Sequence, residues 1–261
     1  MGRYASWYGG VLILVEPLVV LKSIVKEYGD KGRSVRVLDG INLEIGSEIL
    51  AILGPSGCGK STLLRIIAGV EKPTSGEVIY RAVDKNRPQI GFVFQSPSLV
   101  PWLTVLENVA LPLRARGMPK REAEEHARRY LSLVGLQEFE DFYPDELSGG
   151  MRQRVNLARA LSIGPEILLM DEPFSQLDPL TAENLRAELL DIWLSGLAPI
   201  KSIVLVTHDV IEAVYIADRI AILTSRPARV AAVVNVNLPR PRNRLSPDFT
   251  KLVDLIYEYV S

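Results

Sequence analysis

Residues 54–62 have the sequence GPSGCGKST, which fits the pattern G-x-x-x-x-G-K-[ST]. Glycines allow successive backbone N–H groups to turn toward one anion, and a helix that begins here adds the positive end of its dipole. Lys60 is then expected to reach the β- and γ-phosphates of a nucleotide, and the Ser61 hydroxyl to ligate Mg²⁺. This stretch, which we call the phosphate loop, predicts nucleotide binding by Gly54, Pro55, Ser56, Gly57, Cys58, Gly59, Lys60, Ser61 and Thr62.

Two acidic residues follow a short apolar run in the stretch ILLMDEP, residues 167–173. Asp171, at the end of the expected strand, is suited to hold the Mg²⁺ shell beside a nucleotide. Glu172 would point elsewhere and is a candidate general base that polarises the attacking water. A solvated strand end is the alternative interpretation of such a pair, but the phosphate loop upstream favours the catalytic one.

Two further apolar runs end in residues that can contact a phosphate or a water. The run IVLVTHD reaches His208 at the end of a predicted core strand, on the edge of the sheet where α/β proteins bind ligands. We expect His208 to contact the γ-phosphate and to act in catalysis with Lys60, although a lone histidine is often only structural. Gln95 closes the run IGFVFQ and is expected to reach Mg²⁺ or the attacking water.

A second glycine-rich stretch, LSGGMRQR at residues 147–154, also has the form of an opening phosphate-binding loop. One chain would then carry two phosphate-shaped stretches, and the residues themselves leave open whether both serve the same nucleotide. The candidate contacts in this second stretch are Leu147, Ser148, Gly149, Gly150 and Met151.

The elements that position these residues are predicted from short β-branched runs alternating with helical patterns. Residues 103–135 have a mostly helical, amphipathic pattern, in which Glu124 precedes Arg128 by four residues on an expected solvated face. Apolar residues from Phe249 to Val260 predict a packed C-terminal helix. The order indicates an α/β protein with a mainly parallel core and an inserted helical part. Expected strands cover 17–25, 35–44, 48–53, 77–80, 89–94, 166–170, 202–207, 219–223 and 229–236.

Composition argues against several classes of function. The 261 residues include 30 Lys and Arg against 31 Asp and Glu, and no basic arm or stripe for nucleic acid is visible. The single cysteine, Cys58, rules out an internal disulfide and fits a reducing compartment. The apolar run 11–21 is too short to span a bilayer and lacks signal-peptide features, so any membrane role is expected to be peripheral.

In order along the chain, GPSGCGKST, Gln95, LSGGMRQR, ILLMDEP, SQLD and His208 resemble the ATP-binding subunits of ABC transporters over nearly the whole length. LSGGMRQR is similar to the signature of that family, and we call it the signature segment. The resemblance implies a P-loop NTPase core with a mainly parallel sheet, an antiparallel β edge and an inserted α-helical subdomain. Within a single domain over 1–261, the core would cover 17–95 and 155–240, the helical subdomain 96–154 and a C-terminal helix 241–261.

The same resemblance implies a head-to-tail homodimer of ATPase subunits. Each ATP would lie between the phosphate loop of one subunit and the signature segment, Leu147 to Met151, of the other. Asp178 in SQLD would lie in the loop that contacts the partner's phosphate loop. Tyr28 would stack on adenine, with a surface tyrosine as the alternative. ATP and Mg²⁺ are the implied cofactors, and the metal would be held by Ser61, Gln95 and Asp171.

The stretches PWLTVLENVALPL and VTHDVIEAVYIADR are most similar to importer ATPases of the nitrate, sulfonate and taurine class. That resemblance implies integral-membrane permease subunits, which residues 96–108 would contact, with Trp102 as either a docking or a core residue. It also implies an extracytoplasmic solute-binding protein as an indirect partner, and a peripheral place on the cytoplasmic face of the cell membrane. Three stretches depart from the pattern: Gln176 replaces a usual alanine, RPARV at 226–230 lacks a usual glycine, and EIGSEIL before the phosphate loop is slightly irregular.

Three functions remain open at this point. The first is the ATPase of such an importer. The second is an ABC ATPase that works without a permease, or an importer ATPase for another solute class. The third is a regulatory nucleotide-binding subunit without turnover, against which the intact Glu172 and His208 argue.

Overall fold

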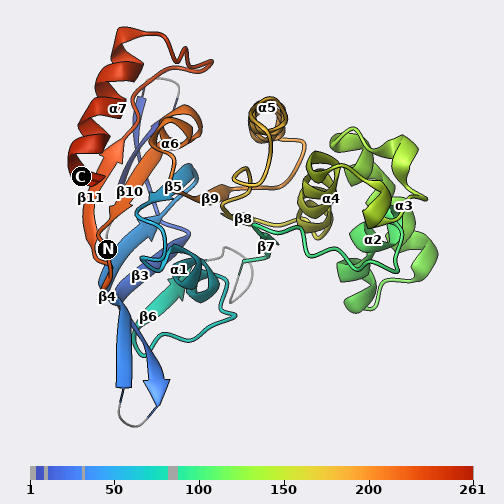
Figure 1. Cartoon of the computed structure of the whole chain (residues 1–261), viewed down its shortest axis with the longest axis horizontal. Coiled ribbons are helices and arrows are strands. Elements are labelled where there is room, and N and C mark those ends of the chain that lie inside the picture. The colour runs from blue at the N-terminus through green and yellow to red at the C-terminus, as the bar shows by residue number, and fades with distance from the viewer. Residues whose placement is uncertain (1–3, 9–10, 31–32, 82–87, 261) are drawn as a thin grey trace. The chain divides into compact units, whose positions relative to one another are not determined.

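The computed structural model describes residues 4–8, 11–30, 33–81 and 88–260 (Figure 1). The chain forms two compact units, Met1–Pro88 with Lys201–Ser261, and Gln89–Ile200. We call the first the nucleotide-loop unit and the second the signature unit. The phosphate loop and His208 belong to the nucleotide-loop unit, whereas Gln95, the signature segment and both acidic residues belong to the signature unit.

Strands of the nucleotide-loop unit form two sheets and a hairpin. In the antiparallel sheet, β3 (Val19–Asp30) lies between β4 (Arg33–Ile45) and β6 (Ser75–Tyr80). The other strands are ordered β11 (Val230–Asn235), β10 (Arg219–Leu223), β5 (Ile49–Leu53) and β9 (Ser202–Thr207). There β5 is parallel to both of its neighbours, and β11 is antiparallel to β10. The hairpin pairs β1 (Tyr4–Tyr8) with β2 (Val11–Val15).

Apolar sequence explains why β5 and β9 form the centre of this unit. All residues of both strands are buried, as expected for parallel strands that are covered on both faces. The helices of the unit are α1 (Lys60–Ile67), α6 (Val210–Ile216) and α7 (Pro247–Val260). Helix α7 packs against α6 (Figure 1). It buries Phe249, Val253 and Ile256 at the helical spacing that the sequence predicted.

The signature unit combines a parallel strand pair with a group of packed helices. Strand β7 (Ile90–Val93) pairs with β8 (Ile167–Asp171). A capping box, in which Thr104 and Glu107 each accept a hydrogen bond from the other's backbone N–H, begins α2. Helices α2, α3 and α4 contact one another. The helical elements are α2 (Val105–Ala115), α3 (Lys120–Leu133), η1 (Gln137–Phe139), η2 (Pro144–Glu146), α4 (Gly149–Ser162) and α5 (Pro179–Ser195).

The predicted α/β class is confirmed, and each expected strand has a counterpart from β3 to β11. The hairpin β1–β2 was not predicted, because the run 11–21 reads as one apolar stretch. On the helix face expected to be solvated, Glu124 pairs with Lys120 at 3.5 Å and Arg128 pairs with Glu140 at 2.7 Å. No helix in the described ranges is long and apolar enough to cross a membrane.

Candidate active site

The phosphate loop leaves the carboxyl end of β5 and passes directly into α1. Glycine is required at Gly59, where φ is +122° and an added Cβ would lie 2.7 Å from Val37 Cγ1. Lys60 is only 4% exposed, and its Nζ donates hydrogen bonds to the carbonyl oxygens of Gly54 at 2.8 Å and Pro55 at 2.9 Å. The loop's own carbonyl groups therefore hold the ammonium group that is predicted to bind phosphate.

His208 lies at the same sheet edge as the phosphate loop. Strands β5 and β9 are parallel, with Leu53 opposite Thr207, so the next residues, Gly54 and His208, leave neighbouring strands at one edge. His208 is exposed. The next residue, Asp209, caps α6. Its carboxylate accepts hydrogen bonds from the backbone N–H groups of Ile211 at 2.8 Å and Glu212 at 3.1 Å. The prediction that His208 lies at the ligand edge agrees with this register.

Tyr28 lies beside the helix that follows the phosphate loop. Its hydroxyl is 3.3 Å from Thr62 Oγ1, and the residue is 40% exposed. Lys26 Nζ lies 4.9 Å from the ring centroid and also pairs with Glu71 at 2.9 Å. Burial, and then the hydrogen bond with Glu71, raise the pKa of the Tyr28 hydroxyl. The ring is thus fixed in position while part of it stays exposed, as base stacking requires.

Both acidic residues lie at the carboxyl end of the strand pair in the signature unit. Asp171 is the last residue of β8 and is 8% exposed. Glu172 follows with φ of 43°, which residues other than glycine rarely adopt. Backbone strain of this kind clusters at functional sites, so the conformation of Glu172 agrees with a role in catalysis.

The side chain of Ser175 links Gln95 to the backbone of Glu172 through two hydrogen bonds. Gln95 lies just beyond β7, whose register places Val93 opposite Met170, one residue before Asp171. Gln95 Nε2 donates to Ser175 Oγ at 3.2 Å, and this hydroxyl donates to the carbonyl oxygen of Glu172 at 2.9 Å. The structure therefore brings Gln95 and the acidic pair together within one unit.

Sequence reasoning missed two residues of α4 that fix these strand ends. Gln153 is buried and donates to the carbonyl oxygens of Phe94 at 3.3 Å and Pro173 at 2.8 Å. Asn156, also buried, donates to the Phe94 carbonyl oxygen at 3.0 Å. The Phe94 carbonyl group immediately precedes Gln95, and the Pro173 carbonyl group immediately follows Glu172. Two amides three residues apart in one helix were visible in the sequence, but the groups that they bind were not.

The signature segment begins α4. Ser148 is the N-cap, and its Oγ accepts a hydrogen bond from the backbone N–H three residues later at 3.2 Å. Gly150 allows α4 to approach α5 closely, because an added Cβ would lie 2.3 Å from Thr181 Cγ2 of α5 and that side chain would have to move, whereas one at Gly149 would meet open space. Asp178 caps α5 through the Thr181 N–H at 3.0 Å, and hydrogen bonds from Thr181 lower the pKa of the Asp178 carboxyl.

The predicted Mg²⁺ ligands offer oxygen donors of the kinds that this ion prefers. They are a hydroxyl at Ser61, an amide at Gln95 and a carboxylate at Asp171. Within the described part of the chain, no cluster of three or more His, Cys, Asp and Glu could hold a metal ion. This donor set fits an ion that takes several of its ligands from phosphates and water.

Comparison with known proteins decides the family. A family model described as ABC transporter matches residues 38–175, which contain the phosphate loop, Gln95, the signature segment and both acidic residues. The chain belongs to the ABC transporter family. The predicted membership in the ABC ATP-binding subunits is thereby confirmed.

Relatives of this ABC chain cover most of its length. It is 48% identical over 232 residues to an uncharacterized ABC transporter ATP-binding protein of Methanocaldococcus jannaschii, covering 88% of this chain and 86% of the relative. It is 44% identical over 227 residues to the aliphatic sulfonates import ATP-binding protein SsuB of Bacillus subtilis, covering 86% and 87%.

A solved structure bears on the activity. The chain resembles a dimeric ATP-binding cassette in a post-hydrolysis state, bound to ADP and Pi, with a TM-score of 0.73 and 36% identity. The match covers 84% of this chain and 99% of that one. The chain is an ATPase subunit of the ABC transporter family, and this membership argues against the interpretation as a regulatory subunit without turnover.

Proposed function

We propose that the chain energises an importer of small sulfonate-like solutes. The observation that carries this proposal is its similarity to aliphatic sulfonates import ATP-binding proteins of Bacillus cereus and Bacillus subtilis. The identities are 39% and 44%, over 90% and 86% of this chain. An ABC ATPase without a permease and an importer ATPase for another solute are the alternatives.

In this proposal two subunits pair head to tail and share two ATP sites. The exposed Ser148 and the open space beside Gly149 support a contact between the signature segment and a partner's ATP. The N–H groups at the start of α4 would add hydrogen-bond donors to the phosphates that Lys60 contacts. A site completed only on pairing suits phosphoryl transfer, which depends mainly on positioning and electrostatics.

The hydrolytic roles follow the same proposal. Glu172 takes a proton from the water that attacks the γ-phosphate, and His208 and Gln95 position that water. Lys60 neutralises charge that develops on the phosphates. Mg²⁺, when bound, supplies further neutralisation of that charge, and its protein ligands are Ser61, Gln95 and Asp171.

We also propose that residues 96–108 dock a permease at the cytoplasmic face of the membrane. Trp102 is 76% exposed, so its interpretation as a core residue is wrong. The side chain of buried Asn108 holds this segment in place. It accepts a hydrogen bond from the Val100 N–H at 2.8 Å and donates to the carbonyl oxygens of Val100 at 3.1 Å and Leu103 at 3.0 Å. A rigid segment that presents an indole ring is suited to a protein contact.

The genes beside this one provide the test. The expected neighbours encode a membrane permease and a solute-binding protein, and the purified binding protein is titrated calorimetrically with ethanesulfonate, taurine and nitrate. Binding of a sulfonate supports the proposal, and binding of nitrate alone favours an importer of another class. Absence of both genes, together with no polytopic membrane protein in a pull-down, favours an ATPase without a permease.

A further inference from the structure

We propose that Arg226 is a positioning residue of the phosphate loop. It lies in residues 224–229, which follow β10 and which we call the β10 loop. The Nη2 of Arg226 donates a hydrogen bond to the carbonyl oxygen of Gly57, a residue of the phosphate loop. Both residues belong to the nucleotide-loop unit. This inference rests on nucleotide binding by the phosphate loop, and it adds a residue from outside that loop.

The bond to this carbonyl also determines where the next N–H points. A peptide unit is planar and trans, so the Gly57 C=O and the Cys58 N–H point in opposite directions. The Cys58 N–H is directed across the loop at the Pro55 carbonyl oxygen, 3.3 Å away. The same oxygen accepts from Lys60 Nζ at 2.9 Å. Arg226 thus fixes a peptide whose N–H shares an acceptor, the Pro55 carbonyl oxygen, with the ammonium group predicted to bind phosphate.

Gly57 needs an external restraint of this kind. It is exposed, its φ is +72°, and an added Cβ would have only Arg226 Nη2 within 4 Å, at 3.9 Å. A glycine without packed neighbours has more conformational freedom than any other residue. A hydrogen bond that holds it in place lowers the entropy lost when a phosphate orders the loop, and so strengthens binding.

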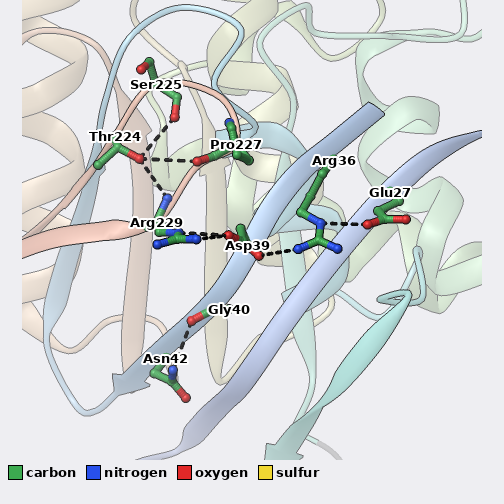
Figure 2. Close-up of polar contacts among 9 residues, drawn as sticks. All are labelled: Glu27, Arg36, Asp39, Gly40, Asn42, Thr224, Ser225, Pro227 and Arg229. Atoms are coloured by element: carbon green, nitrogen blue, oxygen red, sulfur yellow. Dashed lines mark hydrogen bonds and ion pairs between the residues drawn. The ribbon is translucent and has the colours of Figure 1, made fainter. Parts of the chain in front are cut away.

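The β10 loop, which carries Arg226, is anchored to β4, and Figure 2 shows Arg229 of this loop beside Asp39 of β4. The Arg229 guanidinium pairs with the Asp39 carboxylate, with Nε to Oδ2 at 2.8 Å. Two backbone hydrogen bonds of Ala228 also connect the loop to β4. The Ala228 N–H donates to the Val37 carbonyl oxygen at 2.8 Å, and the Ala228 carbonyl oxygen accepts from the Asp39 N–H at 2.9 Å.

The same network of hydrogen bonds continues from Asp39 toward the position at which adenine is predicted to bind. Figure 2 shows Arg36 between Asp39 and Glu27, with hydrogen bonds of 2.9 and 2.7 Å. Glu27 directly precedes Tyr28, the residue predicted to stack on adenine. Strand β4 therefore links the support of the phosphate loop to the strand that carries Tyr28.

The test measures calorimetric binding of ADP, which is not hydrolysed, to the purified chain. We expect Arg226→Met to weaken ADP binding about fivefold, the size of one net hydrogen bond. Because the effect comes from positioning, it should persist between about 0.05 and 0.5 M KCl, a range over which salt screens exposed charges. Arg226→Lys, which retains a donor, should recover most of the affinity. Arg65→Met, which removes an exposed cation from α1, is the matched control and should bind as the wild type.

Three outcomes would overturn the proposal. They are wild-type affinity in Arg226→Met, a loss that vanishes at high salt, and an equal loss in Arg65→Met. A loss of affinity that vanishes at high salt would mean that Arg226 acts only through general electrostatic attraction for the nucleotide. Melting curves of the nucleotide-free variants check that each is folded. Failure of the wild type itself to bind ADP would count against the phosphate loop rather than against Arg226.

Discussion

At the scale of single residues, Glu172 combines a catalytic residue type with an unusual backbone. A positive φ at a residue with a side chain costs on the order of 1 to 3 kcal/mol, and the surrounding structure has to maintain it. Here the Ser175 hydroxyl bonds the Glu172 carbonyl oxygen, and Gln153 bonds the next carbonyl, that of Pro173. These two hydrogen bonds hold the carbonyl groups of Glu172 and of the residue after it, and so help to maintain the strained turn.

The first prediction concerns the general base. Glu172→Gln keeps the size of the side chain and removes its ability to accept a proton, so ATP should still bind and phosphate release should fall to background. Because ATP then stays bound, the variant should also form a dimer that is detectable by size-exclusion chromatography with ATP. Turnover at the wild-type rate would rule out Glu172 as the base.

A second prediction concerns the thiol inside the phosphate loop. Cys58 is 2% exposed, and burial raises the pKa of its thiol, although the nearby Lys60 ammonium opposes the shift. A raised pKa keeps the thiol protonated at neutral pH, and only the thiolate reacts. Iodoacetamide should therefore label the folded chain far more slowly than the urea-unfolded chain at pH 8, measured by mass spectrometry. Equal rates in the two states would contradict this.

At the scale of elements, α4 links the signature segment to the candidate catalytic residues of its own unit. Its first turn is capped by Ser148, Gly150 allows its close approach to α5, and Gln153 and Asn156 hold the ends of β7 and β8. A partner that contacts the start of α4 therefore contacts a rigid helix whose middle turns support Gln95 and Glu172.

The third prediction tests this helix. Ser148→Arg places a bulky side chain where a partner's ATP is proposed to lie, so ATP binding to the phosphate loop should be retained while phosphate release is lost. Ser132→Arg, at an exposed position of α3, is the matched control and should hydrolyse ATP normally. Normal hydrolysis by a folded Ser148→Arg chain would count against the shared site.

At the scale of the whole molecule, the candidate groups are divided between two compact units. The nucleotide-loop unit contains the phosphate loop, Tyr28 and His208, and the signature unit contains Gln95, both acidic residues and the signature segment. In the proposed dimer, one chain's signature segment serves the other chain's nucleotide. Hydrolysis would then require two chains, whereas nucleotide binding would require only one.

The fourth prediction follows from that difference. On serial dilution, the rate of phosphate release per chain should fall once ultracentrifugation shows monomers, because half of each site is then missing. ATP affinity should stay within about twofold over the same range, less than the contribution of one hydrogen bond. A rate per chain that is unchanged in fully monomeric samples would refute the shared site.

The sequence by itself determined those parts of the site that lie in contiguous stretches. The phosphate loop, the acidic pair at the end of β8 and His208 after β9 were predictable, because each depends on a short run of residues that includes a strand end. The strands β3 to β11 were predictable for the same reason, since a local apolar period indicates them. The domain bounds and the roles of the site residues stay predictions.

Only the tertiary structure showed which distant residues support that site. Arg226 and Gly57 are 169 positions apart, and Gln153 reaches Phe94 across 59 positions. An exposed arginine and a helical glutamine have no local pattern that names their partners. Arg226 reaches Gly57 because the parallel strands β5 and β10 bring their carboxyl ends, and the loops that follow them, to one edge of a sheet. Gln153 reaches Phe94 because α4 packs against β7. The chemistry is therefore local in the sequence, whereas its support depends on the fold.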